Sequence, residues 1–127
     1  MLLVDTSVWV DHLNHGEPAL FAALEDQRVL IHPFVIGELA LGNLKTRTIV
    51  LPIFFDLPEA VVARDEEVLS LIDGEQLFGS GIGYVDAHLL TSTRLTAGAS
   101  LWTRDRRLKA VASRLHVATM SIDNSLT

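Results

Sequence analysis

Short apolar runs alternate along this chain with longer segments in which apolar residues recur at helical spacing. Apolar runs bounded by turn residues are typical of buried strands. We expect such strands at 2–5, 29–31, 100–103 and 117–120. The segments between them predict helices at 7–13, 18–26, 33–41, 65–72, 85–97 and 104–114. Short apolar strands that alternate with helices predict an α/β domain around a parallel sheet covered on both faces.

The remaining segments are predicted less directly. Residues 45–55 are apolar enough for a buried helix, although Pro52 interrupts them. The apolar stretch 49–57 (IVLPIFFDL) belongs either to the core or to an interface with another chain. Residues 61–62 are expected to be extended, and 78–84 (FGSGIGY) is expected to be a flexible loop. The polar tail 123–127 is expected to fray.

The bulk composition narrows the class of protein. A length of 127 residues with 49% hydrophobic and 20% charged residues fits a single domain spanning 1–127. The longest apolar runs fall far short of the roughly 20 residues of a membrane span, and the N-terminus lacks the pattern of a secretory signal. The chain has no cysteine, which excludes disulfides and thiolate metal sites and is compatible with a cytoplasmic location.

Charge is distributed unevenly. The net charge of −6 argues against binding of nucleic acid by bulk charge alone. However, six of the ten basic residues lie between Arg94 and Arg114. This basic segment is either a solvated helix face or a contact for an anionic partner.

Four of the acidic residues stand in apolar surroundings. Asp5 ends the run LLVD, Asp105 follows SLWT by one residue, and Asp86 stands in YVDAHLL. Each Asp could instead cap or begin a helix. Glu38 is the one charge in PFVIGELALG and lies mid-helix, where capping does not apply. Its spacing from Phe34 and Leu41 predicts that it shares a stripe with core residues, where an unpaired carboxylate costs several kcal/mol.

Taken together, the four acids indicate a metal site. Chemistry in parallel α/β sheets collects at the carboxyl ends of the strands, where Asp5 and Asp105 are expected. Carboxylates on a shared edge repel one another and raise each other's pKa, which a bound cation relieves. Hard oxygen ligands suit Mg²⁺ or Mn²⁺. Such an ion lowers the pKa of a bound water and offsets charge on a scissile phosphate, so the pattern points to phosphodiester hydrolysis.

The segments LLVDTSVWV, ELALG, GYVDAHLL and LWTRDRRL resemble the PIN-domain family, and more closely the VapC-type toxins of bacterial and archaeal toxin–antitoxin pairs. The resemblance extends from residue 2 to about residue 120. It implies an α/β/α sandwich with a short, mainly parallel central sheet, usually dimeric, that acts as a Mg²⁺-dependent endoribonuclease. It also implies an RNA substrate and a cognate VapB-like antitoxin that buries its C-terminal segment near the active site.

The resemblance also implies roles for individual residues. Carried over to this chain, the catalytic, metal-binding residues form an acidic quartet of Asp5, Glu38, Asp86 and Asp105. Glu38 or Asp86 could accept the proton of the attacking water. Hydroxyl groups that could orient a carboxylate or water are those of Thr6, Ser7 and Thr103.

Two features beside the quartet have several interpretations. The arginines that follow Thr103 could contact the RNA backbone or the acidic part of an antitoxin, or simply form a solvated face; they are Arg104, Arg106 and Arg107. His88 is expected to point away from Asp86, as an exposed or structural residue.

Other functions remain as alternatives. A housekeeping PIN nuclease of RNA processing would carry the same quartet without an antitoxin. A non-catalytic module would bind RNA or protein only, which a degenerate quartet would favour. Phosphoryl transfer through Asp5 is disfavoured because that arrangement needs a second Asp at position 7, where this chain has Ser7.

Overall fold

The computed structural model describes residues 1–119, which form a three-stranded sheet surrounded by helices. The strands are β1 (Leu2–Val4), β2 (Val29–Leu30) and β3 (Ser100–Trp102), in the order β2-β1-β3. Both pairings are parallel, with Leu2 opposite Val29 on one side and Val4 opposite Trp102 on the other. The predicted α/β class with a short parallel sheet is confirmed.

Seven helices lie within the described residues, and the signals that begin several of them are visible in the sequence. Pro18 and Pro33 occupy the first turn of their helices, where proline is tolerated. Three acids stand in the first turn of the fifth helix, where the helix dipole favours them. The helices are α1 (Thr6–His15), α2 (Pro18–Glu25), α3 (Pro33–Leu41), α4 (Arg47–Phe55), α5 (Asp65–Gly74), α6 (Tyr84–Leu95) and α7 (Arg106–Arg114).

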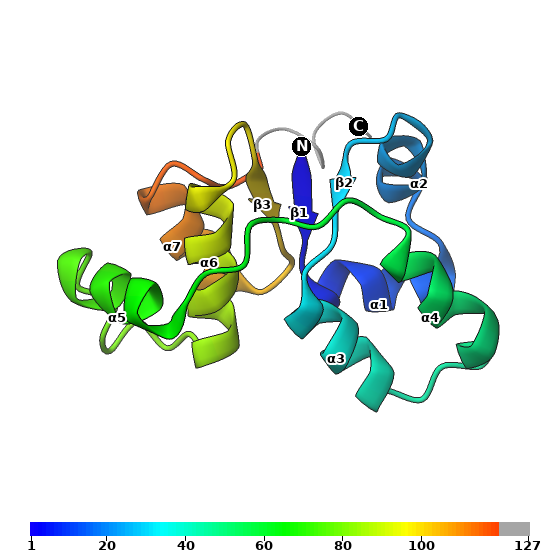
Figure 1. Cartoon of the computed structure of the whole chain (residues 1–127), viewed down its shortest axis with the longest axis horizontal. Coiled ribbons are helices and arrows are strands. Elements are labelled where there is room, and N and C mark those ends of the chain that lie inside the picture. Colours follow the sequence, from blue (N-terminus) through cyan, green and yellow to red (C-terminus); the bar gives the residue numbers. More distant parts are fainter. Residues whose placement is uncertain (120–127) are drawn as a thin grey trace.

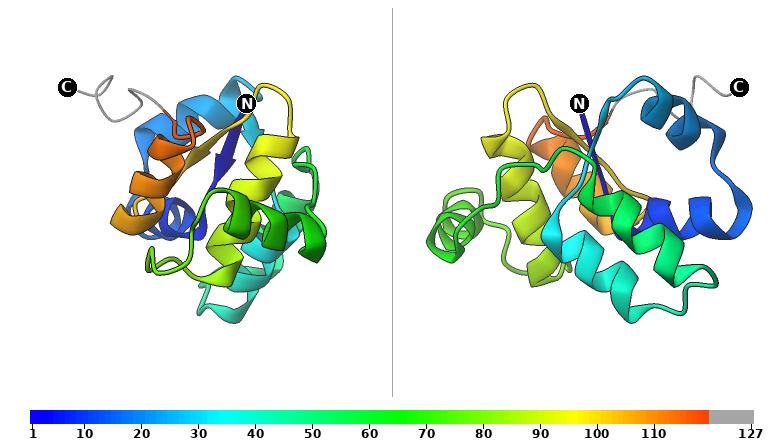
Figure 2. Two further views of the ribbon diagram at one scale, coloured as in Figure 1. Left: turned by 90° about the vertical axis from the view of Figure 1, so that its left-hand side faces the viewer. Right: turned by 45° about the vertical axis from the view of Figure 1, so that its right-hand side comes forward.

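The helices lie on both sides of the strands. Helices α2 and α4 lie beyond β2, α1 and α3 lie below the strand arrowheads, and α5 to α7 lie on the β3 side (Figure 1). Seen from the side, α1 and α7 are on one side of β1 and α6 is on the other (Figure 2). The strand arrows point toward the beginnings of α1, α3 and α6, so these three helix starts surround the carboxyl edge of the sheet (Figure 1).

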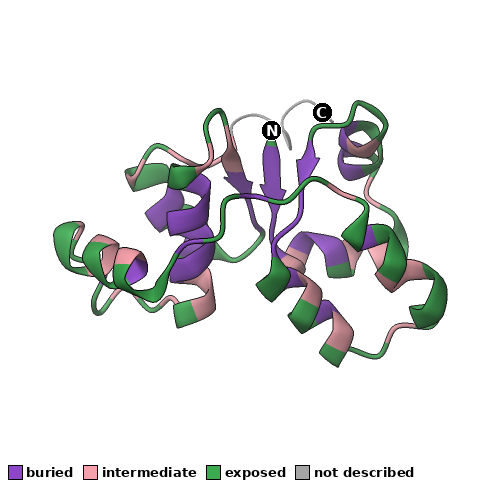
Figure 3. Ribbon diagram, in the orientation of Figure 1, coloured by how far each residue is buried: buried purple, intermediate pink, exposed green. Residues whose placement is uncertain are grey.

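The core consists of the strands and the helix faces that cover them. All three residues of β1 are buried, and a continuous stretch of α6 from Ala87 to Thr93 is buried as well (Figure 3). Leu3, Leu89 and Leu101 have no exposed surface or almost none. Complete burial of one such leucine contributes about 1.5–3 kcal/mol through the hydrophobic effect.

The apolar stretch around Pro52 and the connection that follows it differ in structure. Residues 47–55 form α4 with Pro52 inside it, and Phe54 is buried while Phe55 is exposed. The stretch 49–57 is therefore neither wholly core nor wholly surface. Residues 61–62 belong to a non-helical connection that crosses in front of the strands (Figure 1). The predicted strand at 117–120 is reduced to a single bridge between Ala118 and Leu101; its last residue and the tail 123–127 lie outside the described residues.

None of the helices within residues 1–119 has the length and apolar character that crossing a membrane requires.

Candidate functional site

The register of the sheet places Asp5 beside Thr103. Val4 and Trp102 are partners in the β1–β3 pairing, and the Asp5 backbone N–H continues it by donating to the Trp102 carbonyl at 2.9 Å. The residues that immediately follow the two strands are therefore neighbours. Both Asp5 and Thr103 are buried.

Two hydroxyl groups hold the Asp5 carboxylate. Ser7 Oγ and Thr103 Oγ1 donate to the same oxygen, Oδ2 of Asp5, at 2.8 and 2.7 Å. Each hydroxyl oxygen in turn accepts a backbone N–H from the segment after β3, Ser7 from Arg104 and Thr103 from Asp105, both at 3.0 Å. Backbone hydrogen bonds thus fix the two hydroxyl groups, and the hydroxyl groups in turn fix the Asp5 carboxylate.

Asp5 occupies the N-cap position of α1, yet within the described structure its side chain makes no capping hydrogen bond. The capping interpretation is therefore wrong for Asp5. It is correct for Asp105, whose Oδ1 accepts from the Leu108 backbone N–H at 3.0 Å at the start of α7. Asp86 likewise accepts from the backbone of the turn before its helix, since Gly83 N–H donates to Oδ2 at 3.1 Å.

Glu38 approaches this edge from α3. Thr6 Oγ1 donates to Glu38 Oε1 at 2.6 Å, which links α3 to the first residue of α1. The prediction that Glu38 shares a buried stripe with Phe34 and Leu41 is wrong, because these two side chains are 37% and 91% exposed. Val35 and Leu39 face the core instead, so the buried face of α3 is rotated by one residue and leaves Glu38 exposed.

The electrostatics of Asp86 show that the four carboxylates share one region. Asp86 is half-buried in the first turn of α6, and its pKa is raised mainly by desolvation. The Gly83 hydrogen bond opposes this rise, while the negative charges of Asp5, Asp105 and Glu38 add to it. Three carboxylates from separate parts of the chain therefore lie near enough to Asp86, at the carboxyl edge of the sheet, to raise its pKa.

The donor set suits a hard divalent cation, because it consists of carboxylates and hydroxyls without sulfur. As the side chains are oriented, no three His, Asp or Glu groups in residues 1–119 are grouped closely enough to hold one ion. Three of the four carboxylates already accept a hydrogen bond from another group of the protein; they are Glu38, Asp86 and Asp105. Joint coordination of an ion by the quartet therefore requires rotation of some of these side chains.

The arginines that follow Thr103 differ in their surroundings. Arg104 is held by acids near α1, with Nε 2.9 Å from Asp11 and a second ion pair to Glu17. Arg107 is exposed and lies against the loop before α6, where a Cβ added to Gly81 would come within 2.8 Å of Arg107 Cδ. Gly81 has a φ of +87°, a backbone conformation that favours glycine. Among the described residues Arg107 makes no ion pair and lies beside the loop that leads to Asp86, whereas Arg104 is held in two ion pairs.

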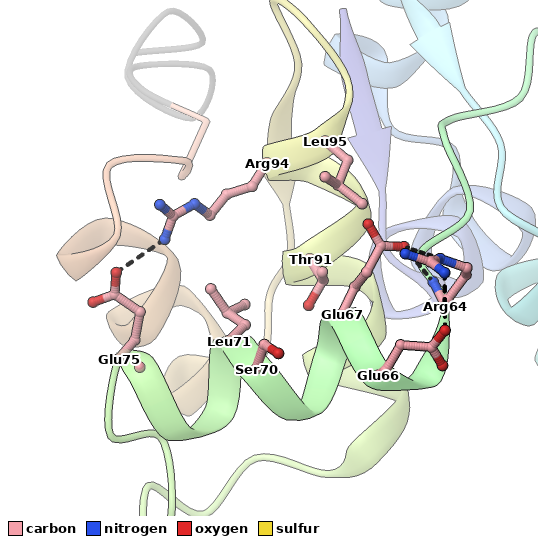
Figure 4. Close-up of a pocket in the computed structure, with 10 residues that line it drawn as sticks. Arg64, Glu66, Glu67, Ser70, Leu71, Glu75, Thr91, Arg94 and Leu95 are labelled. Atoms are coloured by element: carbon pink, nitrogen blue, oxygen red, sulfur yellow. Dashed lines mark hydrogen bonds and ion pairs between the residues drawn. The ribbon is translucent and has the colours of Figure 1, made fainter.

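A separate hollow lies between α5 and α6, away from the acidic quartet (Figure 4). Leu71 and Thr91 contribute to its wall, and an ion pair of 3.0 Å between Arg94 and Glu75 closes one end. None of the four quartet carboxylates lines it, so it is not part of the candidate site.

Two polar networks behind the site were not predicted from the sequence. His88 is buried, contrary to the exposed alternative, and its Nε2 lies 2.9 Å from Asp65 Oδ1. His32 is fully buried, accepts from Phe34 N–H through Nδ1 and lies 3.1 Å from Ser92 Oγ through Nε2. The available signal was that Tyr84 and His88 are four residues apart and so share a helix face.

A parallel α/β domain that gathers four carboxylates at the carboxyl edge of its sheet has the architecture of a PIN-like domain. No protein-family profile matches the chain. It is, however, 48% identical over 118 residues to "Ribonuclease VapC32" of Mycobacterium tuberculosis, in both strain CDC 1551 / Oshkosh and strain H37Rv. These alignments cover 93% of this chain and 95% of each relative. The chain belongs to the VapC-type family of PIN-domain proteins.

Proposed function

We propose that this protein is a Mg²⁺- or Mn²⁺-dependent endoribonuclease, the toxin of a VapBC-type toxin–antitoxin pair. One observation carries the proposal. The buried carboxylate of Asp5 is held by two hydroxyl groups, and its charge acts together with those of Glu38 and Asp105 on Asp86. The name of the Mycobacterium relatives supports ribonuclease activity and membership of such a pair.

In this proposal the acidic quartet would hold the metal ion, whose chemistry when bound would be to lower the pKa of a water and offset charge on the scissile phosphate. Ser7 and Thr103 keep Asp5 in one orientation, so that this ligand need not be ordered when an ion binds. Glu38 or Asp86 accepts the proton of the attacking water. As the water oxygen bonds to phosphorus, the bond from phosphorus to the leaving sugar oxygen breaks.

The proposal also includes partners. A VapB-like antitoxin would inhibit the enzyme by burying a segment near the acidic site, and a homodimer is the expected assembly. Exposed apolar side chains on α4 are available for such protein contacts, among them Ile49, Ile53 and Phe55. A cytoplasmic location belongs to the proposal because the RNA substrate is found there.

The test is cleavage of a mixed pool of structured RNAs by the purified protein. Reactions contain Mg²⁺, Mn²⁺ or EDTA, and a parallel set uses Asp86→Asn. We expect discrete fragments with either metal, none with EDTA, and a loss of about 10²-fold or more in the variant, in which a metal-binding and proton-accepting carboxylate becomes a neutral amide.

The outcomes separate the candidate functions. Fragments that appear equally in EDTA would contradict metal dependence. RNA binding without cleavage by the folded protein would favour the non-catalytic module. The products of genes adjacent to the gene for this chain can be co-expressed with it. If none of them inhibits cleavage, the housekeeping nuclease is favoured.

A further inference from the structure

Three aromatic rings from α3 and α6 form a cluster that the proposed chemistry does not use. We define the aromatic cluster as Phe34, Tyr84 and His88. The Phe34 and Tyr84 rings meet His88 edge to face, with centroids 4.6 and 4.8 Å from its ring. His88 is buried beneath them, whereas Phe34 and Tyr84 are 37% and 47% exposed. The cluster therefore offers two aromatic surfaces to solvent on a buried support.

Hydrogen bonds hold the Tyr84 side of the cluster in place. Tyr84 OH donates to Asp65 Oδ1 at 2.8 Å, and His88 Nε2 lies 2.9 Å from the same oxygen. These bonds lower the pKa of Asp65, with the Tyr84 hydroxyl as the largest cause. Because the Asp65 carboxylate only accepts, His88 Nε2 carries the proton. An exposed ring that is already ordered loses little conformational freedom when it binds a ligand.

The Phe34 side is supported by a second histidine. The His32 ring lies 5.3 Å from the Phe34 ring, and His32 is itself tied to Ser92 on α6. Phe34 is thus braced between two buried imidazoles from different elements, His32 and His88. Because part of the Phe34 side chain is exposed, core packing alone does not explain why two buried histidines support its ring.

The cluster lies close to the acidic quartet. Phe34 precedes Glu38 by four residues on α3, which places the two side chains on one helix face, about one 5.4 Å turn apart. Tyr84 and Asp86 both belong to the first turn of α6. Residues two apart on a helix point in different directions, so Tyr84 faces His88 and not Asp86. The nearness of the cluster to the quartet therefore rests on Phe34 and Glu38, which share one face of α3.

We propose that Phe34 and Tyr84 form a stacking subsite for one unpaired nucleobase of the RNA, beside the phosphate at the acidic quartet. This subsite rests on the proposed ribonuclease function and adds to it a defined position for one base. Proteins recognise single-stranded RNA by stacking splayed bases on aromatic side chains. Since the Tyr84 hydroxyl is already bonded to Asp65, stacking here accepts any base rather than reading one.

Binding of single-stranded RNA tests the subsite. An unstructured oligoribonucleotide with 2-aminopurine at successive positions is titrated with wild-type protein in EDTA, so that binding is measured without metal-dependent cleavage. Stacking quenches 2-aminopurine, and we expect strong quenching at one position. Phe34→Leu and Tyr84→Leu should each weaken binding by about 5- to 150-fold, the range for loss of one stacked base. Neither should change the dependence of affinity on salt, because no phosphate contact is lost.

Matched variants distinguish stacking from general damage. Tyr84→Phe keeps the ring and loses only the bond to Asp65, so its affinity should stay within about threefold of wild type. Phe21→Leu removes an aromatic ring that is 58% exposed on α2, outside the cluster, and should bind as wild type. Thermal melting identifies any variant that fails to fold. The quenching of 2-aminopurine by the wild type tests the subsite even if a variant does not fold.

Three results would overturn the subsite. Both leucine variants could bind RNA as tightly as wild type while the wild type cleaves RNA, which would leave the proposed function intact. They could instead convert a dimer into a monomer with unchanged RNA affinity, which would make the cluster a protein interface. A wild type that neither binds nor cleaves RNA would remove the proposed function and the subsite together.

Discussion

Thr103 donates a 2.7 Å hydrogen bond to Asp5 although the two residues are 98 positions apart in the chain. The bond orders the central carboxylate of the proposed metal site. We expect Thr103→Val, which keeps the side-chain volume and removes the hydroxyl, to weaken Mg²⁺ activation of RNA cleavage by about 10- to 100-fold. The measurement is the Mg²⁺ concentration that gives half-maximal cleavage.

Thr93→Val is the control for Thr103→Val. Thr93 is also buried, and its hydroxyl donates to the Leu89 carbonyl within α6 at 2.7 Å. The control should lose about 1 kcal/mol of stability without a change in Mg²⁺ activation. An equal loss of activation in both variants would show that Thr103 acts only through stability.

Asp86→Asn should make the metal-free protein more stable at neutral pH. The pKa of Asp86 is raised in the folded state, so the ionised carboxylate costs stability above that pKa. The amide removes the charge and keeps an oxygen to accept from Gly83. We expect a higher melting temperature for the variant in EDTA. A lower one would mean that the carboxylate contributes to the fold through contacts other than repulsion.

Magnesium should reverse this order. An ion that binds only the folded state stabilises it by mass action, by about 1.4 kcal/mol at ten times the dissociation constant. Wild type should therefore gain melting temperature with Mg²⁺, and Asp86→Asn should gain little. Sodium chloride at matched ionic strength controls for screening. Equal shifts in both proteins would contradict a site that includes Asp86.

Arg107 and Arg104 should differ in their effect on RNA binding. Within residues 1–119 Arg107 makes no ion pair, and it lies beside the loop before α6. Arg107→Gln should therefore weaken RNA binding and reduce the slope of log affinity against log salt by about 0.7, the value for one phosphate contact on a single strand. Arg104→Gln breaks the ion pairs to Asp11 and Glu17 and should leave this slope unchanged. The slopes come from titrations between low and moderate salt. A loss of slope in Arg104→Gln alone would reverse the assignment.

His32 should make stability depend on pH in the acid range. Burial, followed by the nearby His88, lowers the pKa of His32 from 6.5 to about 4. The unfolded chain therefore binds a proton more readily than the folded protein between these values. Stability should be greatest above about pH 6.5 and fall as the pH drops toward 4, by up to about 3 kcal/mol for this residue.

His32→Asn isolates this effect, because Asn can still accept the Phe34 N–H at the start of α3 but does not titrate in this range. The variant should show a flatter pH profile in denaturant unfolding than the wild type. Parallel profiles would assign the acid sensitivity to other groups.

Much of the local structure follows from the sequence alone. Helix α3 begins at Pro33 and ends at Leu41, as its proline and the following Gly42 predict. The run LLV forms a buried parallel strand and delivers Asp5 to its carboxyl end. These features depend on contacts within one turn or on a short apolar run, and such signals are contained in neighbouring residues.

The tertiary structure decided which side chains meet. It paired Asp5 with Thr103 instead of with the backbone of α1, rotated α3 so that Glu38 is exposed, and buried His88 beneath Phe34 and Tyr84. It also paired Arg104 with Asp11 and Glu17 and placed Arg107 against Gly81 in the loop before α6. Each of these outcomes depends on strand register or on the rotation of a packed helix. A shift of one residue in strand register or helix rotation brings different side chains together. The same shift hardly alters the local pattern of apolar and polar residues.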